Sequence, residues 1–141
     1  MKNKKVAPWI GLVLFLALLA GCSSPAADPP AVNVTGTWQG TMHADGLGSE
    51  TGRLRLEQSG SAVTGDFAVL DRYVFYTIGQ VSGRVSGNRL NLTLTLDTTV
   101  ADPGGGNFSG TVTGNSFDGT GSLRNDATGQ SARFTFSMTQ R

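Results

Sequence analysis

Apolar and polar residues alternate with a period of two from Thr35 almost to the C-terminus. The clearest segment is 90–97, in which leucine occupies every second position and asparagine, threonine and aspartate fill the positions between. This alternation is typical of a β-strand with one face in a hydrophobic core and the other in water. Seven further segments share it: 37–42, 53–57, 63–69, 81–86, 108–112, 117–123 and 134–138. The pattern therefore predicts an all-β domain of eight strands.

Two glycine–asparagine pairs, Gly87-Asn88 and Gly114-Asn115, lie at the centre of two similar stretches of sequence. Glycine and asparagine adopt positive φ more readily than other residues, as two-residue hairpin turns require. Turns at these pairs predict two facing pairs on the apolar side: Val85 with Leu90, and Val112 with Phe117. Strand register and hydrophobic face then agree in both hairpins.

A sheet with one apolar face needs something to cover that face, and the sequence holds no convincing amphipathic helix. Eight strands in meander order can close into an antiparallel up-and-down barrel, in which the first and last strands pair. Glycines on the apolar face, such as Gly65, Gly83 and Gly119, would let the strands coil tightly. A Greek-key β-sandwich is the alternative. An inverted membrane barrel is disfavoured because its strands would be short and no aromatic girdles are visible.

The N-terminal segment has the parts of a bacterial export signal. A cationic head at 1–5 precedes an uncharged stretch at 6–20, whose continuous apolar part is too short to span a bilayer comfortably. The stretch leads into Leu19-Ala20-Gly21-Cys22, which contains the only cysteine of the chain. This motif resembles the lipobox of bacterial lipoproteins.

That resemblance implies that the chain is cut before Cys22, that the Cys22 thiol receives a diacylglycerol, and that the new amino group is acylated with a fatty acid such as palmitate. We therefore expect a signal peptide at 1–21, a lipidated cysteine with a proline-rich tether at 22–34, and a barrel domain at 35–141. Such a protein is anchored by lipid to a membrane of the cell envelope. In a Gram-negative host this is the outer membrane, and otherwise it is the outer face of the cell membrane.

A second resemblance lies in Gly36-Thr37-Trp38, which opens the first predicted strand. At the start of an eight-stranded meander this tripeptide resembles the Gly-x-Trp opening of lipocalin-like and avidin-like barrels. In those families the tryptophan plugs the closed end of the barrel and packs against a late arginine. Arg133 and Arg141 are the late arginines of this chain.

Charge and cysteine content exclude several classes of function. All three lysines lie in the predicted signal peptide, so the remaining chain carries eight arginines and ten acidic residues, a net charge of −2. This balance offers no basic surface for nucleic acid. One histidine and no free thiol cannot build a common metal site, and no nucleophile or phosphate-binding motif is present. We expect no enzyme activity, no cofactor and no metal.

The longer predicted links fall at one end of the barrel, and the glycine–asparagine turns fall at the other end with the tether. The longer loops therefore face away from the membrane, at an end that we call the mouth. Alternation fails between Val69 and Ile78, where both faces of the segment are apolar. The candidate residues for contact with a ligand or partner are Trp38, Tyr73, Phe75 and Tyr76.

The sequence thus predicts a lipid-anchored binding module for a small hydrophobic ligand or a protein partner. The ligand is expected to be hydrophobic because the inward residues are almost all apolar. The alternative is a structural or assembly accessory of the envelope with a dry core.

Overall fold

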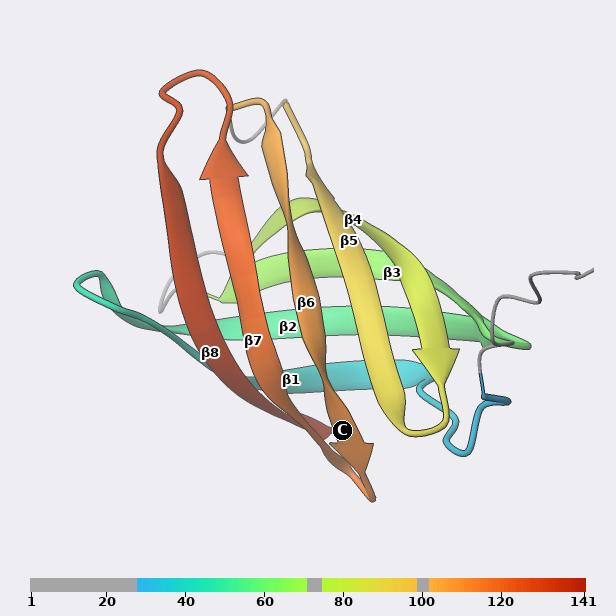
Figure 1. Cartoon of the computed structure of the whole chain (residues 1–141). Coiled ribbons are helices and arrows are strands. Elements are labelled where there is room, and N and C mark those ends of the chain that lie inside the picture. The colour runs from blue at the N-terminus through green and yellow to red at the C-terminus, as the bar shows by residue number, and fades with distance from the viewer. Residues whose placement is uncertain (1–27, 71–74, 99–101) are drawn as a thin grey trace, which may run out of the picture.

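The computed structural model describes residues 28–70, 75–98 and 102–141. Within these ranges the chain forms eight β-strands and no helix. They are β1 (Gly36–Ala44), β2 (Gly48–Ser59), β3 (Ala62–Leu70), β4 (Phe75–Ser86), β5 (Arg89–Leu96), β6 (Gly104–Thr113), β7 (Ser116–Asn125) and β8 (Ser131–Gln140). Each strand pairs antiparallel with the next, and β8 pairs with β1, so the sheet closes into an up-and-down barrel (Figure 1). The predicted all-β barrel is confirmed, and the sandwich alternative is wrong.

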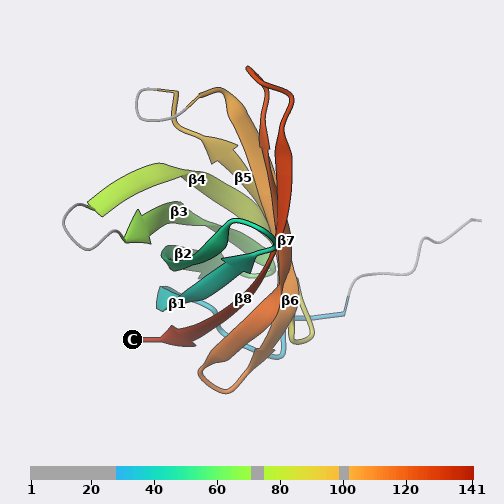
Figure 2. The ribbon, with the colours of Figure 1, turned by 90° about the vertical axis from the view of Figure 1, so that its left-hand side faces the viewer.

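The barrel is strongly twisted. Strands β1 to β3 run across strands β5 to β8 at a steep angle, as the two side views show (Figures 1 and 2). Such crossing is expected where a sheet of right-handed twist closes on itself with tilted strands.

Glycine begins each of three two-residue turns at one end of the barrel. Gly60, Gly87 and Gly114 have φ angles of 60°, 56° and 56°, and no non-glycine residue of the described ranges has a positive φ. Positive φ at the first central residue alone is the pattern of a type II′ turn, which favours glycine at that position. The resulting register contains both predicted pairs, Val85 with Leu90 and Val112 with Phe117.

The inward face of the barrel holds one hydrophobic core. The Phe108 ring is fully buried, and its centroid lies 5.1 Å from Phe67, 5.3 Å from Phe134 and 5.5 Å from Phe136, each in an edge-to-face arrangement. No polar or charged residue is buried among residues 28–70, 78–98 and 102–141, whose side chains the structure describes. The aromatic rings therefore pack across the middle of the barrel, and this part of the interior is filled.

Strands β6 and β7 approach closely where Gly110 pairs with Gly119. A Cβ atom on Gly119 would lie 2.1 Å from the carbonyl oxygen of Ser109 and 2.6 Å from the Cα atom of Gly110. Both atoms belong to the backbone and cannot turn aside as a side chain can. Only glycine fits this position without displacing a strand.

Strand pairing shifts register between β3 and β4, where the alternation of the sequence also fails. Phe67 pairs with Gly79, and the next pair is Ala68 with Thr77. Ile78 is therefore an extra residue in β4, and it forms a β-bulge, which bends and twists the strands locally. Both Phe67 and Ala68 are fully buried beside it. Strict alternation predicts Ala68 on the outer face, and that prediction is wrong because the bulge interrupts the period of two.

Residues 29–35, which we call the lead, lie against the end of the barrel that carries the short turns. The Ala31 N–H donates to the Gly87 oxygen at 2.8 Å, and the Gly87 N–H donates to the Pro29 oxygen at 3.1 Å. Val34 is fully buried, and Val32 packs against the core from the same side. The last part of the segment predicted as a tether is thus packed on the barrel.

Gln58 holds the lead in place with its side-chain amide. Its oxygen accepts a hydrogen bond from Val34 N–H at 2.8 Å, and its nitrogen donates to the Gly60 oxygen at 2.9 Å. The Trp38 indole N–H donates to the Val34 oxygen at 2.9 Å, which satisfies the one polar group of a fully buried side chain. Together these bonds close this end of the barrel.

Candidate functional site

The mouth differs from the closed end because no segment like the lead is seen across it among the described residues. The strands are joined there by residues 45–47, 71–74, 97–103 and 126–130. Partly buried apolar side chains extend the core toward this end: Ala44, Val69, Ile78, Leu96 and Leu123. Apolar surface therefore continues from the packed middle of the barrel to the mouth.

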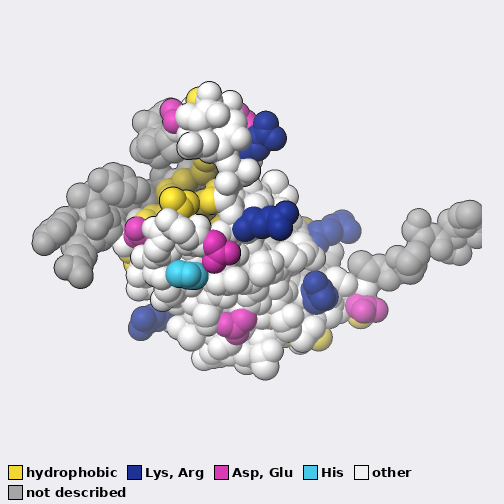
Figure 3. All heavy atoms as spheres, turned by 60° about the vertical axis from the view of Figure 1, so that its left-hand side comes forward, with side chains coloured by type: hydrophobic (Ala, Val, Ile, Leu, Met, Phe, Trp, Pro, Cys, Tyr) yellow, Lys and Arg dark blue, Asp and Glu magenta, His cyan; other side chains and the backbone are white. Residues whose placement is uncertain are grey.

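An apolar cavity of about 480 Å³ opens at the mouth, and we call it the mouth cavity. Its apolar lining residues are Leu47, Leu96, Leu123 and Ala132, and its polar ones are Arg124, Asn125, Gln130 and Ser131. Figure 3 shows hydrophobic side chains in a hollow of the surface beneath a projecting lobe. Cavities of this size and character hold small organic molecules in other proteins.

Two inward glycines of β6 leave room for two of the leucines that line this cavity. A Cβ atom on Gly104 would lie 3.1 Å from Leu96 Cδ1, and one on Gly106 would lie 3.0 Å from Leu123 Cδ2. The two leucines therefore lie directly against glycine backbone. Because β6 contributes no side chain here, Leu96 and Leu123 fill the space over its backbone and line the mouth cavity.

Among residues 28–70, 78–98 and 102–141, whose side chains the structure describes, Leu47 is the only large hydrophobic one that is exposed, at 74% of its surface. It lies at the tip of the β1–β2 hairpin, between Gly46 and Gly48, whose φ angles are 77° and 92°. An exposed leucine at the edge of an apolar cavity is available for contact with whatever enters it.

Polar side chains order the rim of the mouth cavity. Arg124 Nε lies 3.1 Å from Asp126 Oδ1, and Asn125 Nδ2 donates to Asp102 Oδ2 at 2.8 Å. The Asn125 side-chain oxygen also accepts from the backbone N–H of Ala127 at 2.9 Å. Both members of the Arg124–Asp126 ion pair are more than half exposed, so the pair contributes at most about 1 kcal/mol. The rim is thus ordered mainly by the hydrogen bonds of the Asn125 side chain.

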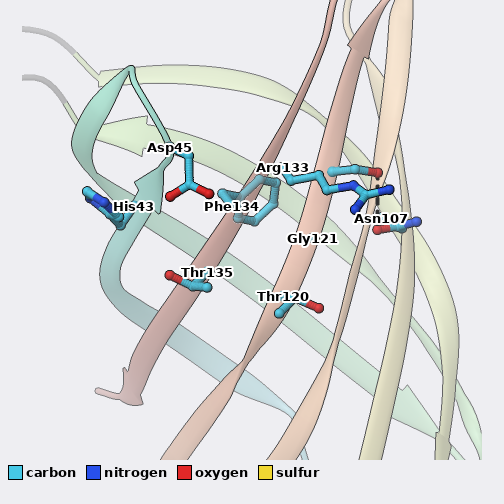
Figure 4. Close-up of a pocket in the computed structure, with 9 residues that line it drawn as sticks. His43, Asp45, Asn107, Thr120, Gly121, Arg133, Phe134 and Thr135 are labelled. Atoms are coloured by element: carbon cyan, nitrogen blue, oxygen red, sulfur yellow. Dashed lines mark hydrogen bonds between the residues drawn. The ribbon is translucent and has the colours of Figure 1, made fainter.

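A second hollow of about 450 Å³ lies on the outside of the barrel, and we call it the outer groove. It is lined by His43, Asp45, Asn107, Thr120, Gly121, Ser122, Arg133, Phe134 and Thr135. In Figure 4, Arg133 extends from β8 toward Asn107, while His43 and Asp45 lie on the side of the β1–β2 hairpin. The Ser122 hydroxyl donates to Asn107 Oδ1 at 3.4 Å. This groove is more polar than the mouth cavity.

The residues predicted as contacts do not gather at one place. Trp38 is fully buried at the closed end, where its ring packs edge-to-face on Phe117 with centroids 6.2 Å apart. Phe75 and Tyr76 begin β4 near the mouth and pair with Leu70 and Val69. Tyr73 and Cys22 lie outside the described residues. Their contact and lipidation roles stay predictions.

The two late arginines do not lie in the core beside Trp38. Arg133 lines the outer groove, and Arg141 is exposed and donates its backbone N–H to the Thr37 oxygen at 2.8 Å. The tryptophan of this barrel is held by the lead instead, through its bond to Val34.

The described residues offer little titratable chemistry. Burial lowers the pKa of Arg53 below its ordinary value, and the neighbouring Arg55 lowers it further, whereas Asp66 opposes the shift. Arginine remains a cation at neutral pH even so. No three metal-ligating side chains gather anywhere in the described part of the chain. That part also contains no helix long and apolar enough to cross a membrane.

The chain was compared with protein-family models and with curated proteins. No family model matches it, and no curated protein is significantly similar to it.

Proposed function

We propose that this chain is a lipid-anchored cell-envelope protein whose barrel binds a small hydrophobic ligand in the mouth cavity. The main support for this proposal is the apolar cavity of about 480 Å³ at one end of a barrel whose middle is filled. A ligand there would contact Leu96, Leu123 and Ala132, and Leu47 would lie at its exposed side. In this proposal the barrel is lipocalin-like. It has no catalytic role, no cofactor and no nucleic-acid partner.

The lipid anchor in this proposal is Cys22, in the lipobox motif Leu19-Ala20-Gly21-Cys22. Cleavage before Cys22 would remove the signal peptide and leave seven residues, 22–28, before the lead. The lead lies at the closed end, so the tether leaves the barrel on the side opposite the mouth cavity. The mouth would then point away from the membrane, toward ligands or partners in the envelope.

A protein partner at the mouth is the second candidate function. The observation in its favour is Leu47, because an exposed leucine on a projecting hairpin suits a protein surface as well as a small ligand. An assembly accessory with a dry core is a third candidate, supported by the aromatic packing around Phe108.

Replacing Leu123 by glutamate should remove ligand binding. A carboxylate in the mouth cavity would lie in apolar surroundings, and we expect labelling by a diazirine-bearing alkyl alcohol to fall at least about tenfold. The measurement is photo-crosslinking of the full chain in lipid nanodiscs, followed by mass spectrometry of the peptides that cover β7 and β8. Thr95→Glu, on the outward face of β5, is the matched control and should label like the unchanged chain. Equal labelling of the Leu123→Glu and unchanged chains, or labelling spread evenly over the barrel, would count against the mouth cavity as the site.

Replacing Cys22 by alanine should release the protein from the membrane. A diacylated and N-acylated terminus anchors stably, whereas a chain without acyl groups should leave less than about a tenth of the protein in the membrane fraction. Fractionation of cells that express the full chain, with labelled palmitate as a tracer, measures both anchoring and acylation. Ser24→Ala is the control and should stay with the membrane. Membrane retention of the Cys22→Ala chain would contradict the proposed anchor.

A further inference from the structure

Strand β8 extends beyond the end of its partner β1. The β1–β8 register runs from Trp38 paired with Gln140 to Ala44 paired with Phe134, and there it ends. The β7–β8 register continues to Arg124 paired with Ser131. Residues 131–133 of β8 therefore pair with β7 on one side and with no described strand on the other. We call these three residues the open edge.

The backbone groups of the open edge point in a direction that the neighbouring hydrogen bonds define. The Gln140 N–H donates to the Asn115 oxygen, on the β7 side, and the Arg141 N–H donates to the Thr37 oxygen, on the β1 side. Because backbone groups alternate along a strand, even-numbered residues of β8 point to β7 and odd-numbered ones to β1. Ser131 and Arg133 thus direct their N–H and C=O groups to the side where β1 has turned away.

Two hollows that differ in polarity flank the open edge. On the inside, the mouth cavity is lined by Ser131 and Ala132 together with Leu96 and Leu123. On the outside, the outer groove is lined by Arg133 together with His43 and Asp45 (Figure 4). A strand laid against the open edge would place alternate side chains in these two hollows.

We propose that the open edge binds an extended peptide segment of a partner protein, in which apolar residues alternate with polar ones. The peptide adds a strand beside β8 in line with β1, its apolar side chains enter the mouth cavity, and its polar side chains lie in the outer groove. Main-chain bonds to Ser131 and Arg133 supply the affinity, and the two hollows supply the specificity. This inference goes beyond the proposed function because it requires the backbone edge as well as the cavity.

The N-terminal segment of the same chain is too short to reach the open edge. If the chain is cut before Cys22, residues 22–28 span at most about 25 Å when extended. They continue from Pro29, which is bonded to Gly87 at the closed end. The open edge lies at the other end of a ten-residue strand, about 33 Å away along β8. A separate peptide is therefore the occupant that fits.

Two methylated peptides test the backbone pairing directly. Side chains directly opposite each other share a face, so an inward valine of the peptide lies opposite Ala132 and an outward threonine lies opposite Arg133. The threonine N–H groups then point to β8, and the valine N–H groups point away from it. The probe is a fluorescein-labelled peptide of alternating valine and threonine, and its two variants carry N-methyl groups on the threonines or on the valines.

Fluorescence anisotropy with the full chain in lipid nanodiscs measures the affinity of each peptide. We expect the peptide methylated on threonine to bind at least about tenfold more weakly than the peptide methylated on valine. On the protein side, Arg133→Pro should weaken the unmethylated peptide by a similar factor, because it removes the N–H that faces the open edge. Arg133→Ala keeps that N–H and removes only a side chain of the outer groove, so it should weaken binding less than Arg133→Pro does. Hydrogen–deuterium exchange should slow in the fragment that covers 131–133 when the peptide is added.

Three outcomes would overturn this inference: no binding of the unmethylated peptide, equal affinity of the two methylated peptides, or concentration-dependent protection of residues 131–133 in the chain alone. The last would mean that a second copy of the chain occupies the edge. Photolabelling of the mouth cavity by the alkyl alcohol tests the proposed function separately. If the chain binds the peptide but is not labelled by the alkyl alcohol, the small-ligand proposal is wrong and the peptide-binding proposal stands.

Discussion

Replacing Phe108 by alanine lowers the free energy of unfolding by about 4 kcal/mol, within the usual range for removing a buried phenylalanine. The ring is fully buried and meets three other aromatic rings edge-to-face, so its removal leaves a cavity and breaks every one of these contacts. Urea denaturation of the full chain, followed by near-ultraviolet circular dichroism, measures the loss.

Thr113→Ala is the control for Phe108→Ala because it lies on the same strand and is exposed. It should change stability by less than about 0.5 kcal/mol. A loss of less than about 1 kcal/mol for Phe108→Ala would mean that the rings do not pack across the middle of the barrel as described.

Replacing Gly119 by valine is expected to prevent the barrel from closing normally. The new Cβ atom would stand 2.1 Å from the Ser109 oxygen and 2.6 Å from the Gly110 Cα atom, and both belong to β6. Strands β6 and β7 would have to separate where they pair, so we expect a loss of more than about 3 kcal/mol or an insoluble product. Thermal unfolding and the yield of soluble, protease-resistant barrel measure the effect in the full chain with Cys22→Ala, which removes the proposed anchor.

Thr120→Val is the matched control for Gly119→Val. It adds the same side chain at the next position of β7, where the residue is exposed on the outer face. This variant should fold with unchanged stability, and valine suits a strand at least as well as threonine. Equal stability of the two valine variants would show that β6 and β7 do not approach as closely as described.

The architecture could be predicted because its signal is repeated along the whole chain. Each strand assigns its residues to the core or to solvent by alternation, and the turns at Gly87 and Gly114 fix the relative register of their neighbours. Closure followed from the need to cover one apolar face without helices. The exception is the β3–β4 pairing, where the failed alternation between Val69 and Ile78 marks an irregular segment but does not identify Ile78 as the extra residue.

The mouth cavity could not be predicted in the same way. Its apolar wall comes from strand ends and a hairpin tip far apart in sequence: Leu47, Leu96, Leu123 and Ala132. The sequence instead predicts contacts by the aromatic residues of the irregular segment 69–78, because aromatic side chains dominate many binding sites. The available signal was the run Gly104-Gly105-Gly106 at the start of β6, which marks a stretch of wall without side chains. The glycine run contributes to the cavity only because Leu96 and Leu123 lie beside it. Their position beside the glycines is known only from the strand register.

The packing of the lead also depends on a long-range contact. Gln58 is an exposed-looking residue near the end of β2, and nothing nearby in the sequence indicates that it bonds to Val34. Proline content alone favours a free tether for residues 22–34. The structure instead joins part of this segment to the β4–β5 turn at Gly87.

Pairing of the first strand with the last also has a kinetic meaning. Strand β2 follows β1 directly in the sequence and can pair with it early in synthesis. The other partner of β1, strand β8, is the last of the eight strands to be synthesised. Until β8 arrives, one side of β1 remains available for pairing with other chains. Contacts between residues about a hundred positions apart, such as Gln39 with Thr139, also make folding slow compared with helical proteins of this size. A chain shortened before Ser131 should therefore accumulate as aggregates during synthesis, even though most of its core residues are present.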